Sequence, residues 1–323
     1  MCYLQQSSWN VESAINTFFE SPIDGGGQGN RDNPIMVSDH GLLDSSDGSL
    51  NSQLEAEKSN PNLTVLSWNI DGLDERNLLE RTRKVCHVIN SEKPDAVFLQ
   101  EVIPETLSIF QSKCPGYVCK YHEPTCAYFN LMLLKNSSIK TTHDLQCTHF
   151  HSSKMERHLL CQPVMFKNKT ELILMTSHLE STGEGQCKVE RKGQLQQVLT
   201  SMTEQPPQAT VIFGGDTNLR DAEVSAIGGL PNGIVDAWEE SGSPADAKFT
   251  WDVSINDNLD LKYRNKPRLR FDRLFVRSAQ PPHALKTTKC VLVGQERLAG
   301  CGRFPSDHWG VWCEFSQPCG DQN

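Results

Sequence analysis

The sequence predicts an α/β (α+β) domain over residues 63–316, and three features of the chain support this. Short runs of β-branched and apolar residues alternate with longer segments in which apolar residues recur at helical spacing. Several of these apolar runs end in acidic, amide or histidine side chains. With 323 residues, the chain exceeds the length of one typical domain, so one large domain with additional segments is expected.

The N-terminal part differs in composition from this domain. Residues 1–20 include a predicted short helix at 7–20, where aromatic and aliphatic side chains recur at helical spacing. Residues 21–62 are rich in Gly, Ser, Asn and Asp, which is typical of a disordered acidic linker. Seven of the nine net negative charges lie before residue 63. The domain that follows is therefore close to neutral and can carry a basic groove for nucleic acid. Residues 317–323 form a tail.

The cysteines and the first residues bear on the cellular compartment. None of the twelve cysteines forms a Cys-x-x-Cys pair or a zinc-ligand spacing. Residues 1–6 lack the basic and apolar regions of a secretory signal, and no apolar run is long enough to span a bilayer. We therefore expect free thiols in a reducing compartment and no membrane partner.

The domain is predicted to alternate strands and helices along the chain. Strands are expected where β-prone apolar runs are short, at 63–70, 96–99, 128–134, 159–166, 171–177, 211–213, 269–276 and 311–315. A helix is predicted at 75–91, with an apolar stripe of Leu78, Leu79, Val85, Val88 and Ile89. A second is predicted at 188–204, with Leu195, Val198 and Leu199 on its inner face, and a short third helix after Arg220.

The stretch from 211 to 221 contains the most informative pattern. After three apolar strand residues, Gly214 and Gly215 are expected to open a tight turn, because glycine tolerates positive φ and close approach. Asp216 and Asn218 follow two residues apart, a spacing that places both side chains on one face of an extended segment. A polar turn after a buried strand is an equally good interpretation of this stretch taken alone.

Acidic, amide and histidine side chains also follow other predicted strands, and this recurrence predicts a metal site. Gathered at one edge of a sheet, these side chains would form a carboxylate-rich cluster that is unfavourable unless a cation offsets it. Oxygen ligands favour Mg²⁺ or Mn²⁺ over zinc, and such a site suits phosphoester chemistry. The residues are Asn69, Asp71, Glu101, His178, Asp216, Asn218, Asp272, Asp307 and His308.

These strand ends resemble the ordered motifs of the exonuclease–endonuclease–phosphatase superfamily, which are all present between residues 63 and 315. They are Trp68-Asn69-Ile70-Asp71-Gly72, Leu99-Gln100-Glu101, Ser177-His178-Leu179, Gly215-Asp216-Thr217-Asn218, Phe271-Asp272-Arg273 and Ser306-Asp307-His308. The resemblance implies a four-layer αββα sandwich of two mixed sheets, as in DNase I-like enzymes.

Longer stretches are similar to one branch of that superfamily, whose members remove topoisomerase II from DNA. These include Met175-Thr176-Ser177-His178-Leu179-Glu180-Ser181-Thr182 and Gly302-Arg303-Phe304-Pro305-Ser306-Asp307-His308. The resemblance implies a Mg²⁺-dependent phosphodiesterase, with Mn²⁺ as a substitute, that hydrolyses the 5′-phosphotyrosyl bond at a single-stranded DNA 5′ end. It would leave a 5′-phosphate during double-strand break repair. DNA chemistry implies the nucleus, with the cytoplasm as a second location.

The resemblance also implies roles for the site residues. Glu101 would be the main metal ligand, assisted by Asp307 or the adjacent acid Asp71, although Asp71 suits a turn equally well. Asp216 would orient or deprotonate the attacking water, while Asn69 and Asn218 would hold water and a phosphate oxygen. His178 and His308 would donate to phosphoryl oxygens, and Asp272 would fix the ring of His308.

The DNA path is expected beside this cluster. By the same resemblance, Arg220 would bind phosphate and the aromatic residues Trp251 and Phe271 would stack against a single-stranded 5′ end, although core packing explains both rings equally well. The loop at 183–185 departs from the Arg-Gly of the family, and Lys188, Arg191 and Lys192 are expected to compensate.

Two other functions remain open at this stage. One is an abasic endonuclease or exonuclease of the same fold, which His178 disfavours because those enzymes carry Asn there. The other is a ubiquitin or SUMO adaptor with an inactive nuclease fold. Residues 7–20 resemble only the last helix of a UBA-like domain, which weakens the case for ubiquitin. Residues 34–39 resemble a SUMO-interacting motif, a pattern that is also common by chance.

Overall fold

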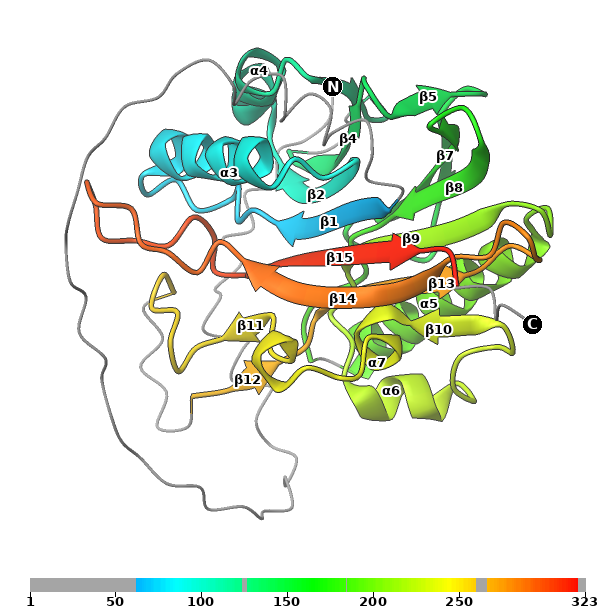
Figure 1. The fold of residues 1–323 in the computed structure, drawn as a ribbon. Helices are drawn as coiled ribbons and strands as arrows, with labels where there is room; N and C mark the ends of the chain where they lie inside the picture. The colour runs from blue at the N-terminus through cyan, green and yellow to red at the C-terminus, as the bar shows by residue number, and fades with distance from the viewer. Residues whose placement is uncertain (1–61, 124–126, 184, 260–265, 319–323) are drawn as a thin grey trace, which may run out of the picture.

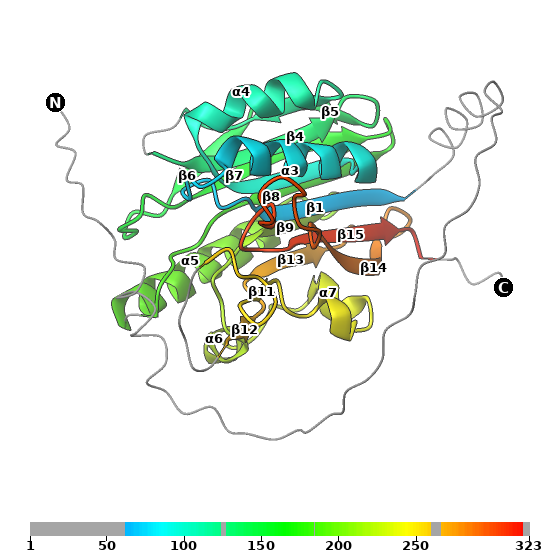
Figure 2. The same cartoon turned by 90° about the vertical axis from the view of Figure 1, so that its left-hand side faces the viewer.

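The computed structural model describes residues 62–123, 127–183, 185–259 and 266–318 (Figure 1). Within these ranges two mixed sheets pack face to face and helices cover both outer faces, which confirms the predicted four-layer sandwich (Figures 1 and 2). The predicted helix at 7–20, the linker up to residue 61 and most of the tail lie outside the described residues. Among the helices in the described ranges, none is long and apolar enough to cross a membrane.

The first sheet has six strands in the order β14-β15-β1-β2-β4-β3. Strands β1 and β2 are parallel, and the other neighbours are antiparallel. The chain ends of β1 and β2 therefore lie at the same edge of the sheet. The strands are β1 (Leu63–Asn69), β2 (Ala96–Val102), β3 (Tyr117–Lys120), β4 (Phe129–Lys135), β14 (Lys286–Val293) and β15 (Gly310–Ser316).

The second sheet has seven strands, in the order β10-β13-β9-β8-β7-β5, with β6 paired to β7. Its one parallel pair is β8 with β9. The strands are β5 (Ile139–Thr141), β6 (Gln146–His149), β7 (His158–Phe166), β8 (Thr170–Thr176), β9 (Thr210–Asp216), β10 (Ile234–Asp236) and β13 (Asp272–Arg277). A separate two-stranded ribbon pairs β11 (Trp251–Asp252) with β12 (Arg268–Leu269).

The central strands are apolar on both faces because each face is covered. Phe98 packs into the core between the sheets, whereas its neighbour Val97 packs against the helices above the first sheet. Ile212 and Phe213 divide in the same way in the second sheet. The covering helices are α3 (Leu78–Glu92) and α4 (Pro104–Lys113) on one side and α5 (Gly185–Glu204) and α6 (Asp221–Ala226) on the other; α7 (Ala237–Glu240) and a 3₁₀ turn (Ala245–Ala247) follow.

Several expected elements need correction. The predicted apolar stripe of α3 is wrong at Leu79, which is 48% exposed, and the buried face instead carries Arg81. Arg81 is tolerated there because its guanidinium donates to the backbone carbonyls of Ile70 and Asp71. The strand expected at 269–276 is broken into β12 and β13. Helix α4 and strands β3, β5, β6, β10 and β14 were not expected from the sequence.

The two glycines of the 211–221 stretch do not open a turn. Gly214 and Gly215 are the last residues of β9 before Asp216, and both are buried in the sheet. A Cβ on Gly215 would collide with the carbonyl of Ser177 on the adjacent segment, and one on Gly214 would press against the Phe98 ring of the other sheet. Glycine is therefore required for close packing between neighbouring segments.

Candidate active site

Strand ends from both sheets bring the predicted polar residues to one edge of the molecule. The parallel strands β1 and β2 end beside each other, with Asn69 last in β1 and Glu101 next to last in β2. Strands β8 and β9 also end beside each other, with His178 two residues past β8 and Asp216 last in β9. Strands β13 and β15 run antiparallel to these neighbours and begin at this edge, where Asp272 pairs in register with Asp216. The eight residues predicted to be catalytic therefore share one site.

Asp216 lies at the centre of this site. It is fully enclosed, and its Oδ2 accepts a hydrogen bond from Asn69 Nδ2 at 2.9 Å and lies 3.2 Å from His178 Nε2. Its Oδ1 accepts from the backbone N–H of Asn218 at 3.0 Å. Burial alone would raise the pKa of Asp216, but the positive charges of His178 and His308 lower it well below the usual range. Asp216 is therefore ionised at neutral pH.

His308 is held by a buried carboxylate, as the sequence predicted. Its Nδ1 lies 2.8 Å from Asp272 Oδ2, and its Nε2 faces the Oδ2 atoms of Asp216 at 3.9 Å and Asp307 at 4.0 Å. Burial would lower the pKa of His308, but the three carboxylates outweigh this and raise its pKa well above the usual value. A protonated His308 uses Nδ1–H for Asp272 and keeps Nε2–H for the site.

Next to this group lies a second cluster, of the acids predicted as metal ligands. Burial, followed by the negative charge of Asp307 and also that of Glu101, raises the pKa of Asp71 well above the usual value. Asp71 Oδ2 is buried and accepts no hydrogen bond within the described ranges, although Arg81 lies 3.5 Å away. Asn69 joins the two clusters, because its Nδ2 also donates to Glu101 Oε1 at 3.1 Å.

This acidic cluster fits a divalent cation. Its donors are carboxylate oxygens that repel one another, and Asp71 Oδ2 is buried with no hydrogen-bond donor among the described residues, the Arg81 guanidinium lying 3.5 Å away. A second group with the spacing of metal ligands consists of Asp216, Asp272 and His308, whose ligand atoms lie within 4.8 Å of one another. In that group, Asp216 Oδ2 accepts from Asn69 and His308 Nδ1 lies 2.8 Å from Asp272 Oδ2, whereas Asp272 Oδ1 is buried without a hydrogen-bond partner among the described residues. The acidic cluster is the better fit for Mg²⁺, because all of its ligand atoms are oxygens.

Backbone strain fixes these side chains at their strand ends. Asp71, Glu101 and Asn218 all have positive φ, at 51°, 59° and 51°. Asp and Asn adopt this left-handed conformation with modest cost, but Glu does so rarely. The strand β2 is irregular between Leu99 and Val102, where the pairing to β4 shifts. The turn at Glu101 directs its carboxylate into the site, which is a strain typical of functional residues.

The predicted DNA-contacting residues lie along one side of the cluster. The rings of Trp251 and Phe271 are 5.6 Å apart, and Phe271 is 6.3 Å from His308. Trp251 Nε1 donates to Asp307 Oδ2 at 3.0 Å, so the ring is tied to an acid of the site. The Arg220 guanidinium stands over Phe271 at 5.4 Å and donates to the carbonyl of Asn218. Both rings are buried, so they pack as core and also border the site.

One expected basic contact is wrong. Arg191 is buried and pairs with Glu223 at 2.6 Å, while its other nitrogen donates to the carbonyls of Glu180 and Thr182. It therefore fixes the loop at 180–182 to α6 and cannot compensate at the groove edge. Lys188 is exposed and Lys192 half-buried, so these two lysines still agree with the expectation.

The structure adds residues that the sequence did not indicate. Arg157 is buried, its guanidinium lies 3.4 Å from His178 Nε2 and 5.2 Å from the centre of the Tyr128 ring, and no carboxylate of the described chain lies within 4.0 Å of it. Ser306 donates to the carbonyl of Asn69 at 2.6 Å and accepts from the N–H of His308. Nothing in the local pattern distinguishes Arg157, which precedes β7 and comes close to the site only through folding.

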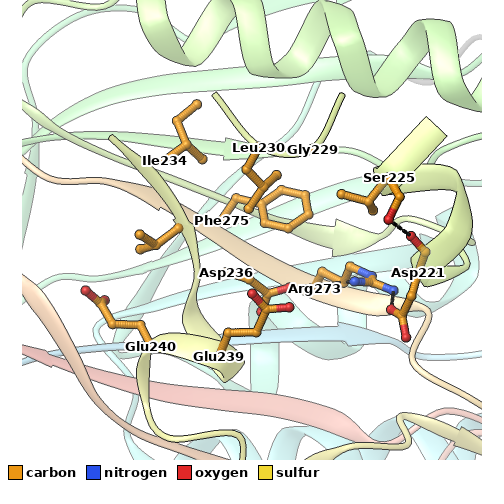
Figure 3. A pocket seen from close by; sticks show the side chains of 12 residues that line it. Asp221, Ser225, Gly229, Leu230, Ile234, Asp236, Glu239, Glu240, Arg273 and Phe275 are labelled. Atoms are coloured by element: carbon orange, nitrogen blue, oxygen red, sulfur yellow. Dashed lines mark hydrogen bonds and ion pairs between the residues drawn. The ribbon is translucent and has the colours of Figure 1, made fainter. Parts of the chain in front are cut away.

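A cavity of about 490 Å³ lies away from this site, between α6, β10, α7 and β13 (Figure 3). Its acids are already paired. Asp236 accepts from Arg270 at 2.6 Å, Asp221 from Arg273 at 2.6 Å, and Glu240 from the backbone N–H of Thr287 at 2.7 Å. These carboxylates hold the outer elements together and leave the cavity without a group suited to hydrolysis.

The fold and this site define a class of protein. Residues 66–308 match the Endonuclease/Exonuclease/phosphatase family, and the chain belongs to that family. Residues 1–23 match the UBA-like domain, although their structure lies outside the described ranges.

Relatives of the chain within that family include tyrosyl-DNA phosphodiesterases. The chain is 41% identical to tyrosyl-DNA phosphodiesterase 2 (TDP2) of Homo sapiens, over 97% of this chain and 87% of the relative. The crystal structure of D. rerio TDP2 complexed with a single-strand DNA product is 40% identical and covers 80% of this chain and 100% of its own, with a TM-score of 0.75. A C. elegans TDP2 structure matches at 31% identity over 97% of this chain and 86% of its own, with a TM-score of 0.71. The chain belongs to the tyrosyl-DNA phosphodiesterase 2 family.

Proposed function

We propose that this chain hydrolyses the phosphodiester bond between a topoisomerase II tyrosine and the 5′ end of DNA, leaves a 5′-phosphate, and does so in double-strand break repair. The observation that carries the proposal is the enclosed cluster around Asp216, in which a carboxylate, Asn69 and two histidines converge beside a separate group of acids. An adaptor with an inactive nuclease fold would not retain this constellation.

The acidic cluster is the proposed metal site. Glu101, Asp307 and Asp71 would hold Mg²⁺, with Mn²⁺ as a substitute, because their oxygens are the ligands that these cations prefer. When bound, the cation neutralises charge on the phosphate and helps to position it. The hydrogen bond from Asn69 to Glu101, and that from Trp251 to Asp307, fix two of the three carboxylates.

Asp216 would orient the attacking water. Its lowered pKa keeps it ionised and makes it a hydrogen-bond acceptor rather than a strong base. The side chain of Asn69 and the N–H of Asn218 occupy both of its oxygens from the protein side, so the carboxylate cannot rotate. A water held by it would be fixed in direction as well as in position.

Hydrogen-bond donors for the phosphoryl oxygens would come from three side chains. His308 offers Nε2–H because Asp272 holds its other nitrogen, and His178 lies between Glu101 and Asp216. Arg157, which has no carboxylate within 4.0 Å in the described chain, lies 3.4 Å from His178 Nε2. These donors would act where negative charge develops in the transition state.

The leaving group explains why no separate general acid is needed. A tyrosine phenol has a pKa near ~10, far below that of a sugar alcohol, so it departs readily as the phenolate. The DNA strand would run past Trp251 and Phe271, which border the site, with Arg220 beside Phe271 available to a backbone phosphate. We place this activity in the nucleus and keep the β-prone run at 34–39 as a proposed SUMO contact.

The test is hydrolysis of a 5′-phosphotyrosyl oligonucleotide with Mg²⁺. We compare wild type with Glu101→Gln and Asp216→Asn, and use Glu105→Gln as a matched control, since Glu105 is exposed on α4. The proposal requires release of tyrosine that both site variants and EDTA abolish and the control retains. Nicking of an abasic duplex without tyrosine release would replace the substrate, and a folded protein inactive on both would favour the adaptor.

A further inference from the structure

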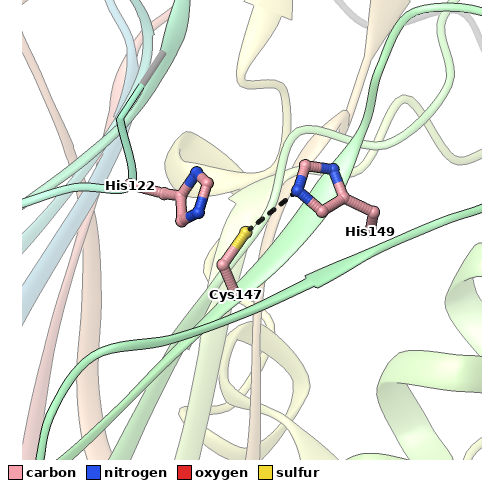
Figure 4. A group of neighbouring side chains, drawn as sticks. All are labelled: His122, Cys147 and His149. Atoms are coloured by element: carbon pink, nitrogen blue, oxygen red, sulfur yellow. Dashed lines mark hydrogen bonds between the residues drawn. The ribbon is translucent and has the colours of Figure 1, made fainter. Parts of the chain in front are cut away.

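A cluster of soft metal ligands lies apart from the active-site acids, at the edge where the two sheets meet. Cys147 and His149 lie two residues apart on β6, so their side chains project from the same face of the strand. His122 comes from the segment that follows β3, an edge strand of the other sheet. One nitrogen or sulfur atom from each lies within 4.8 Å of the others, and Figure 4 shows the three side chains pointing toward one another.

We infer that His122, Cys147 and His149 form a zinc-type site that joins the two sheets. Cys147 Sγ and His149 Nε2 are 3.8 Å apart. Tetrahedral Zn²⁺, with bonds of about 2.3 Å to sulfur and about 2.0 Å to nitrogen, holds such atoms about 3.5 Å apart. The observed spacing therefore needs only a small adjustment to accommodate the ion.

A hydrogen bond to the backbone leaves Nε2 of His122 available to bind a metal. His122 Nδ1 lies 3.1 Å from the carbonyl of Glu123, and a carbonyl only accepts, so Nδ1 carries the proton. Nε2 then keeps its lone pair for a metal. A hydrogen bond from the second imidazole nitrogen to a backbone carbonyl is the usual way in which proteins orient metal-binding histidines.

His158 supplies an independent observation. It lies directly opposite His149 in the β6–β7 pairing, so the two side chains share a face of the sheet. Its ring centre is 5.6 Å from that of His149 and 6.4 Å from that of His122. The side chain is buried, Nδ1 faces the carbonyl of Glu156 at 3.3 Å, and Nε2 has no hydrogen-bond partner in the described chain. The group whose ligand atoms lie within 4.8 Å of one another does not include His158, so this unpartnered buried nitrogen stands beside the three ligands and would join them as a fourth only after a shift of its side chain.

The ligand chemistry separates this site from the catalytic one. Thiolate and imidazole favour zinc over magnesium, whereas the acids near Asp216 favour the reverse. Because the ligands come from both sheets, a bound ion would cross-link segments that are otherwise held by packing at this edge. The expected role is structural, since metal binding to the folded state alone stabilises it.

The experiment uses the full chain, reduced and freed of metal, and titrates it with Co²⁺ and then Zn²⁺. Wild type is expected to gain a sulfur-to-cobalt charge-transfer band that saturates at one equivalent and is bleached by Zn²⁺. The double variant Cys147→Ser/His149→Gln should lack it. The matched control Cys301→Ser/His283→Gln, which changes one half-buried cysteine and one exposed histidine elsewhere, should keep it. Cobalt at the active-site acids gives no such band, because those ligands contain no sulfur.

A second variant keeps the test decisive. His122→Gln leaves the thiolate in place but removes the ligand from the other sheet, so the band should persist while Zn²⁺ affinity falls at least about 10-fold. Zn²⁺ should then raise the thermal midpoint of wild type and of the control more than that of His122→Gln at the same Zn²⁺ concentration. Absence of the band in wild type, its survival in the double variant, or equal Zn²⁺ affinity in all chains would refute the site and leave adventitious binding to surface thiols.

Discussion

Asn69 connects the proposed metal site to the proposed water-holding carboxylate, so its removal tests both at once. Its Nδ2 donates to Asp216 at 2.9 Å and to Glu101 at 3.1 Å, and its Oδ1 accepts from the backbone N–H of Asp71 at 3.0 Å. Asn69→Ala removes two hydrogen bonds to carboxylates, each worth about 1.5–3 kcal/mol. At about 1.36 kcal/mol per factor of ten, kcat/KM should fall about 150- to 25,000-fold.

Asn69→Asp gives the sharper result because it keeps the shape and changes the charge. A third carboxylate about 3 Å from Glu101 and from Asp216 would be repelled by each with an energy on the order of 5 kcal/mol at an effective dielectric of ~20. Without metal this variant should melt well below wild type. Mg²⁺ should raise its thermal midpoint more than that of wild type, because the cation offsets the added charge.

The assay combines steady-state kinetics on the tyrosyl oligonucleotide with melting curves in EDTA and in Mg²⁺. Asn90→Ala is the matched control, since Asn90 is exposed on α3 and donates to the carbonyl of Lys113. The reasoning fails if Asn69→Ala retains wild-type kcat/KM. It also fails if Mg²⁺ stabilises Asn69→Asp no more than wild type, because the added carboxylate would then not face a cation.

Three further outcomes follow from the contacts. Gly215→Ala should unfold more readily and lose activity, because its Cβ meets the carbonyl of the neighbouring segment; unchanged melting would contradict this. Arg270→Met leaves the buried Asp236 with only the more distant Arg273 and should lower the free energy of unfolding by about 3 kcal/mol in urea titrations, with kcat/KM unchanged for the folded fraction. Trp251→Phe removes the hydrogen bond to Asp307 and should raise the Mg²⁺ concentration needed for half-maximal activity. An unchanged Mg²⁺ dependence would show that the ring serves only in core packing.

The sequence predicted the location of the site better than its internal contacts. Apolar runs that end in Asn69, Glu101 and Asp216 are local features, and parallel strands necessarily bring such ends to one edge. The place of Arg157 in the site could not be predicted, because its neighbours in sequence are ordinary for the start of a strand. Its contact with His178 exists only after β7 pairs with β8. The burial of Arg81 could not be predicted either, because a buried arginine depends on backbone carbonyls that only the fold brings near it.

The zinc-type ligands could not be predicted from the sequence for a related reason. His122 lies 25 positions before Cys147 in the sequence, and the two residues come together only because the edges of the two sheets lie close to each other. A search for short metal-binding spacings could not find the set, because Cys147 and His149 lie on one sheet, His122 follows a strand of the other, and His158 lies on the strand opposite.

Glu101 shows why motifs that look separate in the sequence must be understood in pairs. Its left-handed backbone is costly for a glutamate, so another part of the structure must enforce it. Gly72, at the end of a different motif, lies where any Cβ would collide with the Glu101 carbonyl. The same arrangement recurs in the second sheet, where Gly215 makes room for the carbonyl of Ser177, the residue before His178. In each sheet, a glycine in one motif therefore permits the backbone of another to turn its side chain into the site, and the site geometry is a property of these pairs.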